Sequence, residues 1–350
     1  MTSRSDAREL CFSLCLWVAD MAIERSRWVC ASISATLGLS AVLLLAAGPA
    51  RAADFPLAPQ ATAVGAVESY VAEPGDTLMD IGRRHDLGFT QLTAVNRGVN
   101  PWAPGVGRRI SIPNFYLLPD APHRGIVVNL AEQRLYYFPP GKDLVQTFPI
   151  GLGVLGAATP LGTTRIVAKL TAPPWYPPPS IHAERPELPA VIPPGPDNPL
   201  GAYAFRLGWP TVLIHGTNKP DGVGRDVSHG CMHLYPEDIE SLFHEVPVGT
   251  PVRVVDQDVK AAWVGHDLYL EIHPTKEQGD ELDIDQTLPP ASPPDDLAAR
   301  MQQAAGGGAD RIDWAAVRKV ASERTGVPTI VSKPEASDHL VQSEPTAEFQ

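Results

Sequence analysis

The stretch Ile214-His215-Gly216-Thr217-Asn218, a glycine-containing loop and Ser228-His229-Gly230-Cys231-Met232-His233-Leu234 organise the rest of this chain. Cys231 is the only cysteine after residue 52, because the other three precede a predicted export-signal cleavage point. A lone thiol in an exported chain forms no internal disulfide, so it is either inert and buried or a nucleophile. Its histidine and glycine neighbours favour a nucleophile, because imidazoles and exposed backbone N–H groups lower a thiol pKa.

His215 is the candidate base for this thiol. It ends the apolar run Val212-Leu213-Ile214, which predicts a buried strand that delivers the imidazole to a sheet edge. A nucleophile on a turn that faces a base on a neighbouring strand is a general arrangement for acyl transfer through a covalent intermediate.

The order His-Gly, glycine-containing gap, Ser-His-Gly-Cys resembles the signature of the L,D-transpeptidases, enzymes of bacterial peptidoglycan with a YkuD-type catalytic domain. Thr159-Pro160-Leu161-Gly162 resembles a second motif of that family, and the resemblance covers residues 122–256. It implies an α+β protein whose catalytic domain is mostly antiparallel and β-sandwich-like. One position departs from the family, because His233 stands where arginine is usual, so the carboxylate-holding role of that arginine is not carried over.

Residues 67–114 resemble a LysM module. The resemblance rests on the start Gly75-Asp76-Thr77-Leu78, the centre Leu92-x-x-x-Asn96 and the end Ile110-Ser111-Ile112-Pro113. It implies a small βααβ domain that binds the N-acetylglucosamine-containing glycan of peptidoglycan. The alternative is a small domain that only packs on its neighbour.

Composition and the start of the chain predict an exported globular protein. The 350 residues can hold two ordinary domains with tails, and the formal charge of −12 argues against nucleic acid as a partner. Arg25 and Arg27, the apolar stretch 28–47 and Ala50-Arg51-Ala52 predict that residues 1–52 are a signal peptide. An uncleaved membrane anchor is the alternative. We therefore expect a periplasmic, cell-wall-associated protein.

Three further segments have a composition of their own. Residues 53–66 predict a linker of small residues, and residues 257–350 predict a largely acidic and flexible C-terminal extension. Residues 171–199 are rich in proline and predict a rigid lid over a cleft, with a recognition tract for a proline-reading partner as the alternative.

The resemblance assigns catalytic roles to Cys231, His215 and Gly216. The thiolate attacks the bond between the diamino acid and D-Ala of a tetrapeptide stem, and the Gly216 carbonyl orients the imidazole. The other expected site residues are Gly230, His229 and Ser228 in the oxyanion loop, and His233, Trp175 and Tyr176 as substrate contacts. For His233, a side chain that points outward is the alternative. No cofactor or metal is implied.

Several alternatives remain at this level. The thioester is passed to a second stem, giving a 3-3 cross-link, to a lysine of an outer-membrane lipoprotein, or to water, which makes an L,D-carboxypeptidase. A LysM wall-binding scaffold with an inert Cys231 is a non-enzymatic alternative. A zinc site is disfavoured because the ligands His229, Cys231 and His233 crowd one turn. A papain-like endopeptidase is disfavoured because its cysteine precedes its histidine in the chain.

Overall fold

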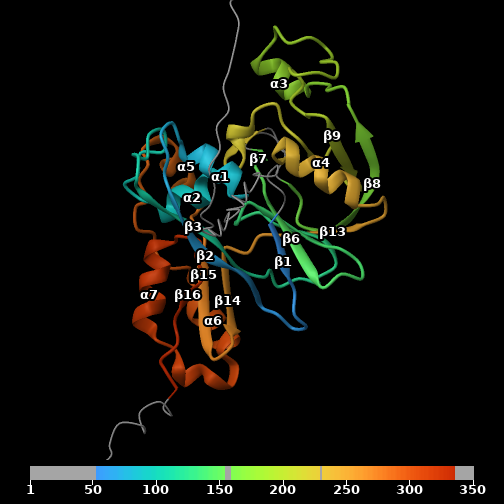
Figure 1. The fold of residues 1–350 in the computed structure, drawn as a ribbon. Helices are drawn as coiled ribbons and strands as arrows, with labels where there is room; N and C mark the ends of the chain where they lie inside the picture. The colour runs from blue at the N-terminus through green and yellow to red at the C-terminus, as the bar shows by residue number, and fades with distance from the viewer. Residues whose placement is uncertain (1–52, 154–158, 229–230, 336–350) are drawn as a thin grey trace, which may run out of the picture. The chain divides into compact units, whose positions relative to one another are not determined.

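The catalytic region is built on one nine-stranded sheet. The computed structural model describes residues 53–153, 159–228 and 231–335. Across the sheet the order is β1 (Ala53–Pro56), β6 (Leu144–Pro149), β5 (Arg134–Phe138), β4 (Gly125–Asn129), β13 (Pro251–Val255), β8 (Gly162–Thr171), β9 (Tyr203–Leu207), β10 (Leu213–His215) and β12 (Met232–His233). All neighbours are antiparallel except β4 with β13 and β10 with β12. The mostly antiparallel α+β fold is thus confirmed (Figure 1).

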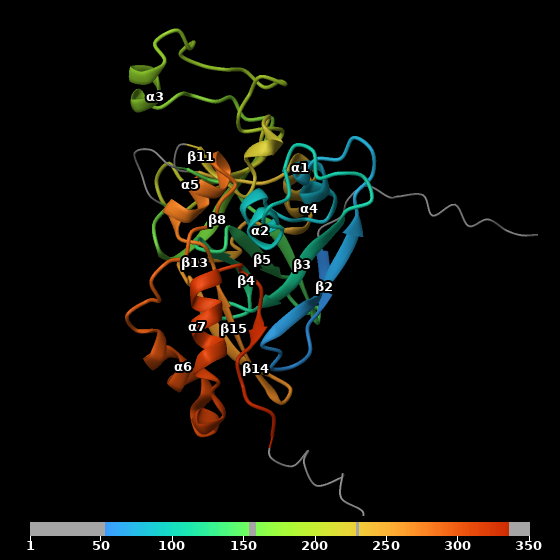
Figure 2. The same ribbon diagram turned by 90° about the vertical axis from the view of Figure 1, so that its left-hand side faces the viewer.

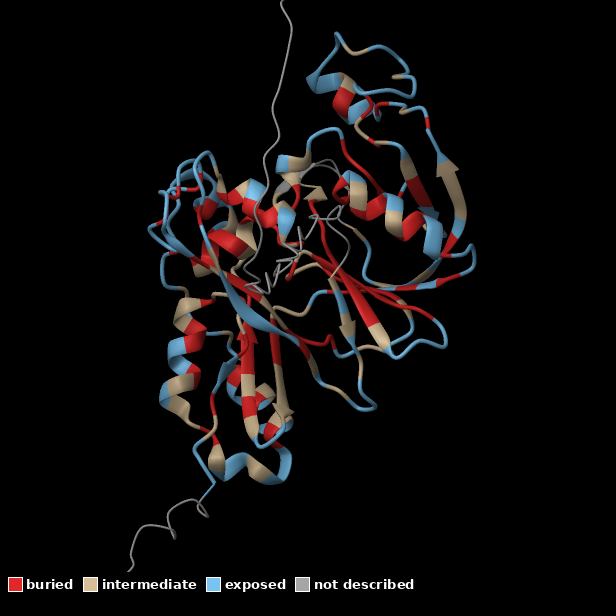
Figure 3. Cartoon of the chain, in the orientation of Figure 1, coloured by how far each residue is buried: buried red, intermediate tan, exposed pale blue. Residues whose placement is uncertain are grey.

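The core of this region lies between the sheet and α4 (Pro236–Glu245). Ile239, Leu242 and Phe243 recur at helical spacing and are buried against strand residues such as Phe205 and Ile214. Burying each large apolar side chain contributes about 1.5–3 kcal/mol, so this stripe holds the helix on the sheet. Figure 3 shows buried positions along both the sheet strands and α4.

The LysM region folds as β2 (Ala63–Val71), α1 (Leu78–Arg84), α2 (Phe89–Val95) and β3 (Arg109–Leu117), which confirms the predicted βααβ order. Thr77 caps α1, because its side chain accepts a hydrogen bond from the Asp80 backbone N–H at 3.0 Å. The predicted linker is more ordered than expected: its first residues form β1 in the large sheet, and β2 begins at Ala63.

In place of the flexible extension expected after residue 256, residues 257–335 form a folded unit. β14 (Val259–Val264), β15 (Asp267–Ile272) and β16 (Thr329–Ile330) make a sheet, and α6 (Leu297–Ala305) and α7 (Trp314–Glu323) contact it. Figure 2 shows these two helices beside β14 and β15. Apolar residues at helical spacing, such as Leu297, Met301 and Ala305, fill its core, and the many acidic residues around them conceal that pattern.

The remaining elements are short. They are β7 (Leu152–Gly153), α3 (Pro179–Glu184), the 3-10 turn Pro220–Gly222, β11 (Asp226–Ser228), α5 (Lys276–Ile284) and the 3-10 turn Gly306–Arg311. β7 and β11 pair in parallel, and α3 lies within the proline-rich segment.

Candidate active site

His215 is held by strands on both sides. β10 pairs with β9 and β12, and the His215 side chain is buried. Its Nδ1 lies 2.5 Å from the carbonyl oxygen of Gly216. Because a carbonyl only accepts, Nδ1 carries the proton and Nε2 keeps its lone pair, which is the tautomer that a base requires. The predicted orienting hydrogen bond is therefore present.

Gly216 is constrained by packing as well as by this hydrogen bond. A Cβ at this position would lie 2.9 Å from Cγ2 of Ile239 in α4. The helix that follows the cysteine thus packs directly against Gly216, whose carbonyl lies beside His215 Nδ1. A side chain at position 216 would displace one or the other.

Cys231 is brought beside β10 by the strand that follows it. Met232 pairs with Ile214 and His233 with His215, so the parallel register of β12 places the cysteine segment next to the histidine strand. The half-buried thiol lies 3.8 Å from the carbonyl oxygen of Thr211. Burial raises the pKa of Cys231, and a hydrogen bond from the Leu213 backbone acts in the opposite direction.

His233 is buried and faces inward. Its ring is 6.2 Å from that of His215, and a Cβ on Gly151 would lie only 2.1 Å from its Cε1 atom, so only glycine fits there. Burial lowers the pKa of His233 to about 4, against a hydrogen bond with the Gly222 backbone. The alternative that His233 points outward is wrong, and a charged contact with a substrate carboxylate is disfavoured at neutral pH.

The candidate nucleophile and base are both uncharged at neutral pH. Burial lowers the pKa of His215 to about 3, and the nearby His233 contributes in the same direction. Because burial raises the pKa of Cys231, the resting pair is thiol and neutral imidazole rather than thiolate and imidazolium. Desolvation is the larger effect on the thiol, so its pKa is raised where the sequence predicted that it would be lowered.

The oxyanion loop is described only in part. Ser228 ends β11 and pairs through its backbone with Gly153 in β7, which agrees with a role in tying the loop. His229 and Gly230 lie outside the described residues. The roles of all three stay predictions.

The proline-rich segment is anchored next to the site at one end. The Asn218 side chain, three residues after His215, donates to the carbonyl of Pro196 at 3.2 Å. Trp175 pairs through its backbone with Ile192, whereas the Tyr176 side chain is 68 % exposed. Among the described residues no hydrogen bond or ring contact joins Trp175 or Tyr176 to His215, so their substrate contact stays a prediction.

The LysM region contacts the loop between His215 and Cys231, which sequence reasoning missed. The backbone N–H of Phe89 donates to Val223 at 3.2 Å, and that of Thr90 donates to Gly224 at 3.1 Å. Gly224 has φ +77°, and a Cβ there would lie 2.3 Å from the Gly88 Cα. In the sequence, the glycine at position 224 was the one sign of this contact, because two backbones approach this closely only where side chains are absent.

A second contact joins the LysM region to α4. The Arg83 guanidinium donates two hydrogen bonds to the Glu237 carboxylate, at 2.6 and 2.7 Å. The Tyr235 hydroxyl donates to the carbonyl of Leu87 at 3.1 Å. A bidentate pair of this kind fixes orientation as well as distance, so it holds the LysM region and the helix after Cys231 in one relative orientation.

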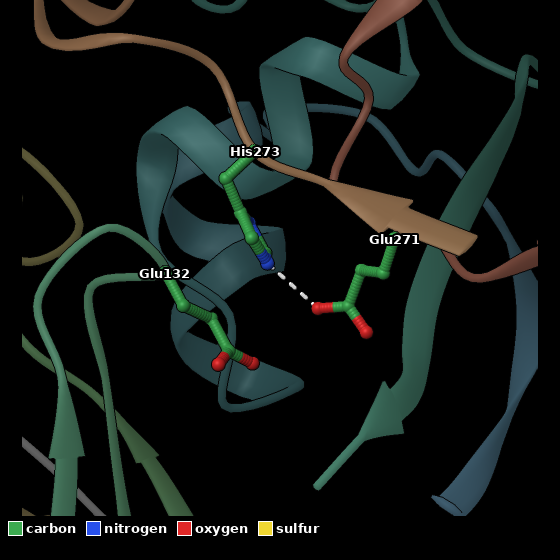
Figure 4. Close-up of side chains that lie close together, drawn as sticks. All are labelled: Glu132, Glu271 and His273. Atoms are coloured by element: carbon green, nitrogen blue, oxygen red, sulfur yellow. Dashed lines mark hydrogen bonds and ion pairs between the residues drawn. The ribbon is translucent and has the colours of Figure 1, made fainter. Parts of the chain in front are cut away.

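One group of described residues has metal-ligand geometry, and Cys231 is not a member of it. Glu132, Glu271 and His273 place their ligand atoms within 4.8 Å of one another, and His273 Nε2 lies 2.6 Å from Glu271 (Figure 4). The ammonium of Lys260 lies 2.8 Å from both carboxylates. This cluster therefore already contains its cation, and the set His215, Cys231 and His233 is not among the described metal-like groups.

Comparison with known proteins identifies the family. The chain is 37 % identical over 323 residues to a probable L,D-transpeptidase of Escherichia coli (strain K12), YcfS, with 89 % of this chain and 97 % of that protein covered. This chain belongs to the L,D-transpeptidases. It is also 38 % identical to the probable L,D-transpeptidase ErfK/SrfK of the same organism over 265 residues, 73 % of this chain and 85 % of that one. With the probable L,D-transpeptidase YbiS it shares 45 % identity over 195 residues, 54 % of this chain and 63 % of the relative.

Two family models divide this L,D-transpeptidase along its chain. The L,D-transpeptidase catalytic domain, YkuD, matches residues 123–254, and the LysM domain matches residues 70–113. Together they imply that peptidoglycan is the binding partner. Within the described residues, no helix is both long and apolar enough to cross a membrane. The predicted signal peptide lies outside the described residues.

Proposed function

We propose that this protein is a periplasmic, cysteine-dependent L,D-transpeptidase that uses Cys231 as nucleophile and His215 as base. The observation that carries the proposal is the 2.5 Å hydrogen bond from His215 Nδ1 to the Gly216 carbonyl. It leaves Nε2 free to accept a proton, on a strand paired with the one that follows Cys231.

Acylation begins when His215 Nε2 takes the thiol proton. The sulfur attacks the carbonyl carbon of the diamino acid in a stem tetrapeptide, and the C–N bond to D-Ala breaks. The imidazolium returns the proton to the leaving amine of D-Ala. The product is a thioester between Cys231 and the shortened stem.

Transfer reverses the roles of the same groups. His215 accepts a proton from an attacking amine, the new amide bond forms, and the proton returns to the departing sulfur of Cys231. The acceptor amine belongs to a second stem, which gives a 3-3 cross-link, or to a lysine of an outer-membrane lipoprotein. Backbone N–H groups of Gly230 and Cys231 are the proposed oxyanion donors, each contributing roughly a hundred- to a thousand-fold in rate.

The uncharged resting pair has a mechanistic consequence. With the pKa of His215 near 3 and that of Cys231 raised, a stable thiolate does not form before substrate binds. Proton transfer then accompanies attack on the carbonyl, where the developing oxyanion compensates for it. The chemistry resembles that of a serine hydrolase more than that of a preformed thiolate enzyme.

The test is intact-protein mass spectrometry of residues 53–350 after incubation with purified disaccharide-tetrapeptide and, separately, with a carbapenem. Cys231→Ala is the matched control, because residues 53–350 contain no other cysteine. We expect an acyl adduct on the unmodified sequence only, together with dimeric muropeptide. Free tripeptide without dimer would show hydrolysis instead. A correctly folded protein with neither adduct nor product would support the wall-binding scaffold.

A further inference from the structure

A cleft of about 420 Å³ is lined by residues from several parts of the chain, and neither His215 nor Cys231 is among them. One wall is α2 of the LysM region, the second is the turn between β4 and β5, and the third is α5 with residues 324–326. This volume lies within the range of sites that bind small ligands. Nothing in the proposed reaction uses this cleft.

The walls of the cleft are packed against one another. Leu282 of α5 and Ala94 of α2 share a buried apolar cluster. Across the cleft, Arg225 pairs with Asp283 at 2.9 Å and lies over the Phe89 ring at 3.8 Å. The cleft is therefore preformed and keeps its shape without a ligand.

Most charged groups of the lining already have partners. The pairs are Arg225 with Asp283, Lys276 with Asp280, Asp258 with Arg300 and Glu132 with Lys260. Two groups remain: within the part of the chain that the structure describes, neither Arg324 nor Asp256 forms an ion pair. After pairing, the cleft thus offers the guanidinium of Arg324 and the carboxylate of Asp256, which accepts a backbone hydrogen bond from Ala131.

Arg324 has further features of a binding residue. It is only 4 % exposed, and its Nε atom is buried without a hydrogen-bond partner in the described structure. Its Nη2 donates to the Ser292 carbonyl at 2.8 Å, so within the described residues the guanidinium is only partly hydrogen-bonded. Burial lowers the pKa of Arg324, and the attraction of the nearby Asp258 carboxylate, which acts in the opposite direction, does not outweigh it.

The backbone of Arg324 is also unusual. It ends α7 in the left-handed conformation, with φ 44° and ψ 51°, where glycine is the common residue. Gly326 follows at φ +69°, and a Cβ there would lie 2.9 Å from Nδ1 of His273. A strained backbone that carries a buried charge into a cleft is a feature of ligand sites.

We propose that this cleft binds a zwitterionic peptide, with the peptide's carboxylate on Arg324 and its amine on Asp256. The identity of the peptide as a stem of peptidoglycan rests on the proposed function, whereas the charge pattern does not. Arg225, on the same cleft, directly precedes β11, the strand that leads toward Cys231. A stem held here would therefore contact the base of the catalytic loop.

The test uses residues 53–350 with Cys231→Ala, so that a synthetic stem tetrapeptide binds without turnover. Isothermal titration calorimetry gives the affinity for the peptide. Hydrogen exchange with mass spectrometry locates the segments whose amides the bound peptide protects. We expect protection over α5 and residues 324–326, and affinity lower by about 10- to 100-fold in Arg324→Gln and in Asp256→Asn. Arg318→Gln is the matched control, because Arg318 is an exposed arginine of the same helix.

Two further measurements separate the outcomes. A peptide with amidated carboxylates is expected to bind Arg324→Gln and the parent equally, and the melting temperature of each variant without ligand reports folding. Protection absent from α5, or equal affinity for the folded Arg324→Gln and the parent, would overturn the proposal. The acyl adduct on Cys231 is measured on the active protein, so cleft binding and the proposed reaction can each fail alone.

Discussion

Gly224, in the loop between His215 and Cys231, meets Gly88 of the LysM region backbone to backbone. A Cβ on Gly224 would lie 2.3 Å from the Gly88 Cα, and the adjacent N–H groups of Phe89 and Thr90 donate to this loop. The wall-binding module is thus part of the support of the catalytic loop. The LysM region therefore contacts the same loop that leads to Cys231.

Gly224→Ala is the direct test of this junction. The positive φ of +77° costs about 1–2 kcal/mol for any L side chain, and the clash with Gly88 adds to it. We expect lower stability and slower carbapenem acylation of Cys231. Gly249→Ala is the matched control, because Gly249 has φ +94° but no atom within 4 Å of the place that a Cβ would take. Equal acylation rates in the two variants would refute a role for the junction.

The thiol of Cys231 is expected to react as a buried, protonated cysteine. Because burial raises its pKa, alkylation by iodoacetamide should be slow at pH 7 and should still be rising with pH above the ordinary cysteine pKa of about 8.5. The measurement is the alkylation rate from pH 6 to 10, with Cys231→Ala as the blank. A plateau near neutral pH would instead indicate a preformed thiolate.

His233 is expected to make the protein sensitive to acid. Its folded pKa of about 4 lies below the unfolded value of about 6.5, so the unfolded state binds more protons between these values. Stability therefore falls as pH falls from 6.5 to 4, by roughly 3 kcal/mol from this group. Urea unfolding of His233→Asn should show a shallower decline, whereas His244→Asn, at an exposed position, should decline like the parent.

Asp86 is expected to have the opposite pH dependence. Burial raises its pKa to about 7. Burial also raises the pKa of Asp238, whose carboxylate oxygens are buried without partners in the described structure. The folded state then keeps a proton that the unfolded state loses above about 3.8, so stability falls as pH rises from 3.8 to 7. We expect Asp86→Asn to stabilise the protein at pH 8 by roughly 1–3 kcal/mol, since asparagine tolerates its φ of 53°.

The control for Asp86→Asn is Asp295→Asn, which neutralises an exposed carboxylate. Urea unfolding at pH 5 and pH 8 measures both. A gain in Asp86→Asn that is the same at the two pH values would mean that proton binding is not its cause.

Lys260 is expected to be essential for the junction of the LysM, catalytic and C-terminal regions. Its ammonium lies 2.8 Å from Glu132 and from Glu271 and donates to the Leu117 carbonyl at 2.6 Å. Lys260→Met leaves two buried carboxylates without their cation, at a cost of about 3–5 kcal/mol. Lys142→Met breaks an exposed pair with Glu245 and should cost less than about 1 kcal/mol. Chemical unfolding of the two variants measures the difference.

Local sequence patterns predicted much of this protein. The order His215, glycine loop and Cys231 and the LysM start Gly75-Asp76-Thr77-Leu78 depend on short-range spacing and turn chemistry, which a sequence shows directly. They led to the family and to the mostly antiparallel α+β fold. The acidic composition after residue 256 was misleading, because a small apolar core needs only a few well-spaced residues.

Only the tertiary structure decided the properties that depend on neighbours distant in the chain. The uncharged state of His215 and Cys231 follows from desolvation by surrounding strands, and the inward position of His233 follows from contact with Gly151. The unpaired Arg324 becomes visible only when every charged neighbour is placed. Burial and pairing are sums over the whole fold, whereas motifs are local. The sequence therefore determined the family and the candidate reacting groups but not their protonation states.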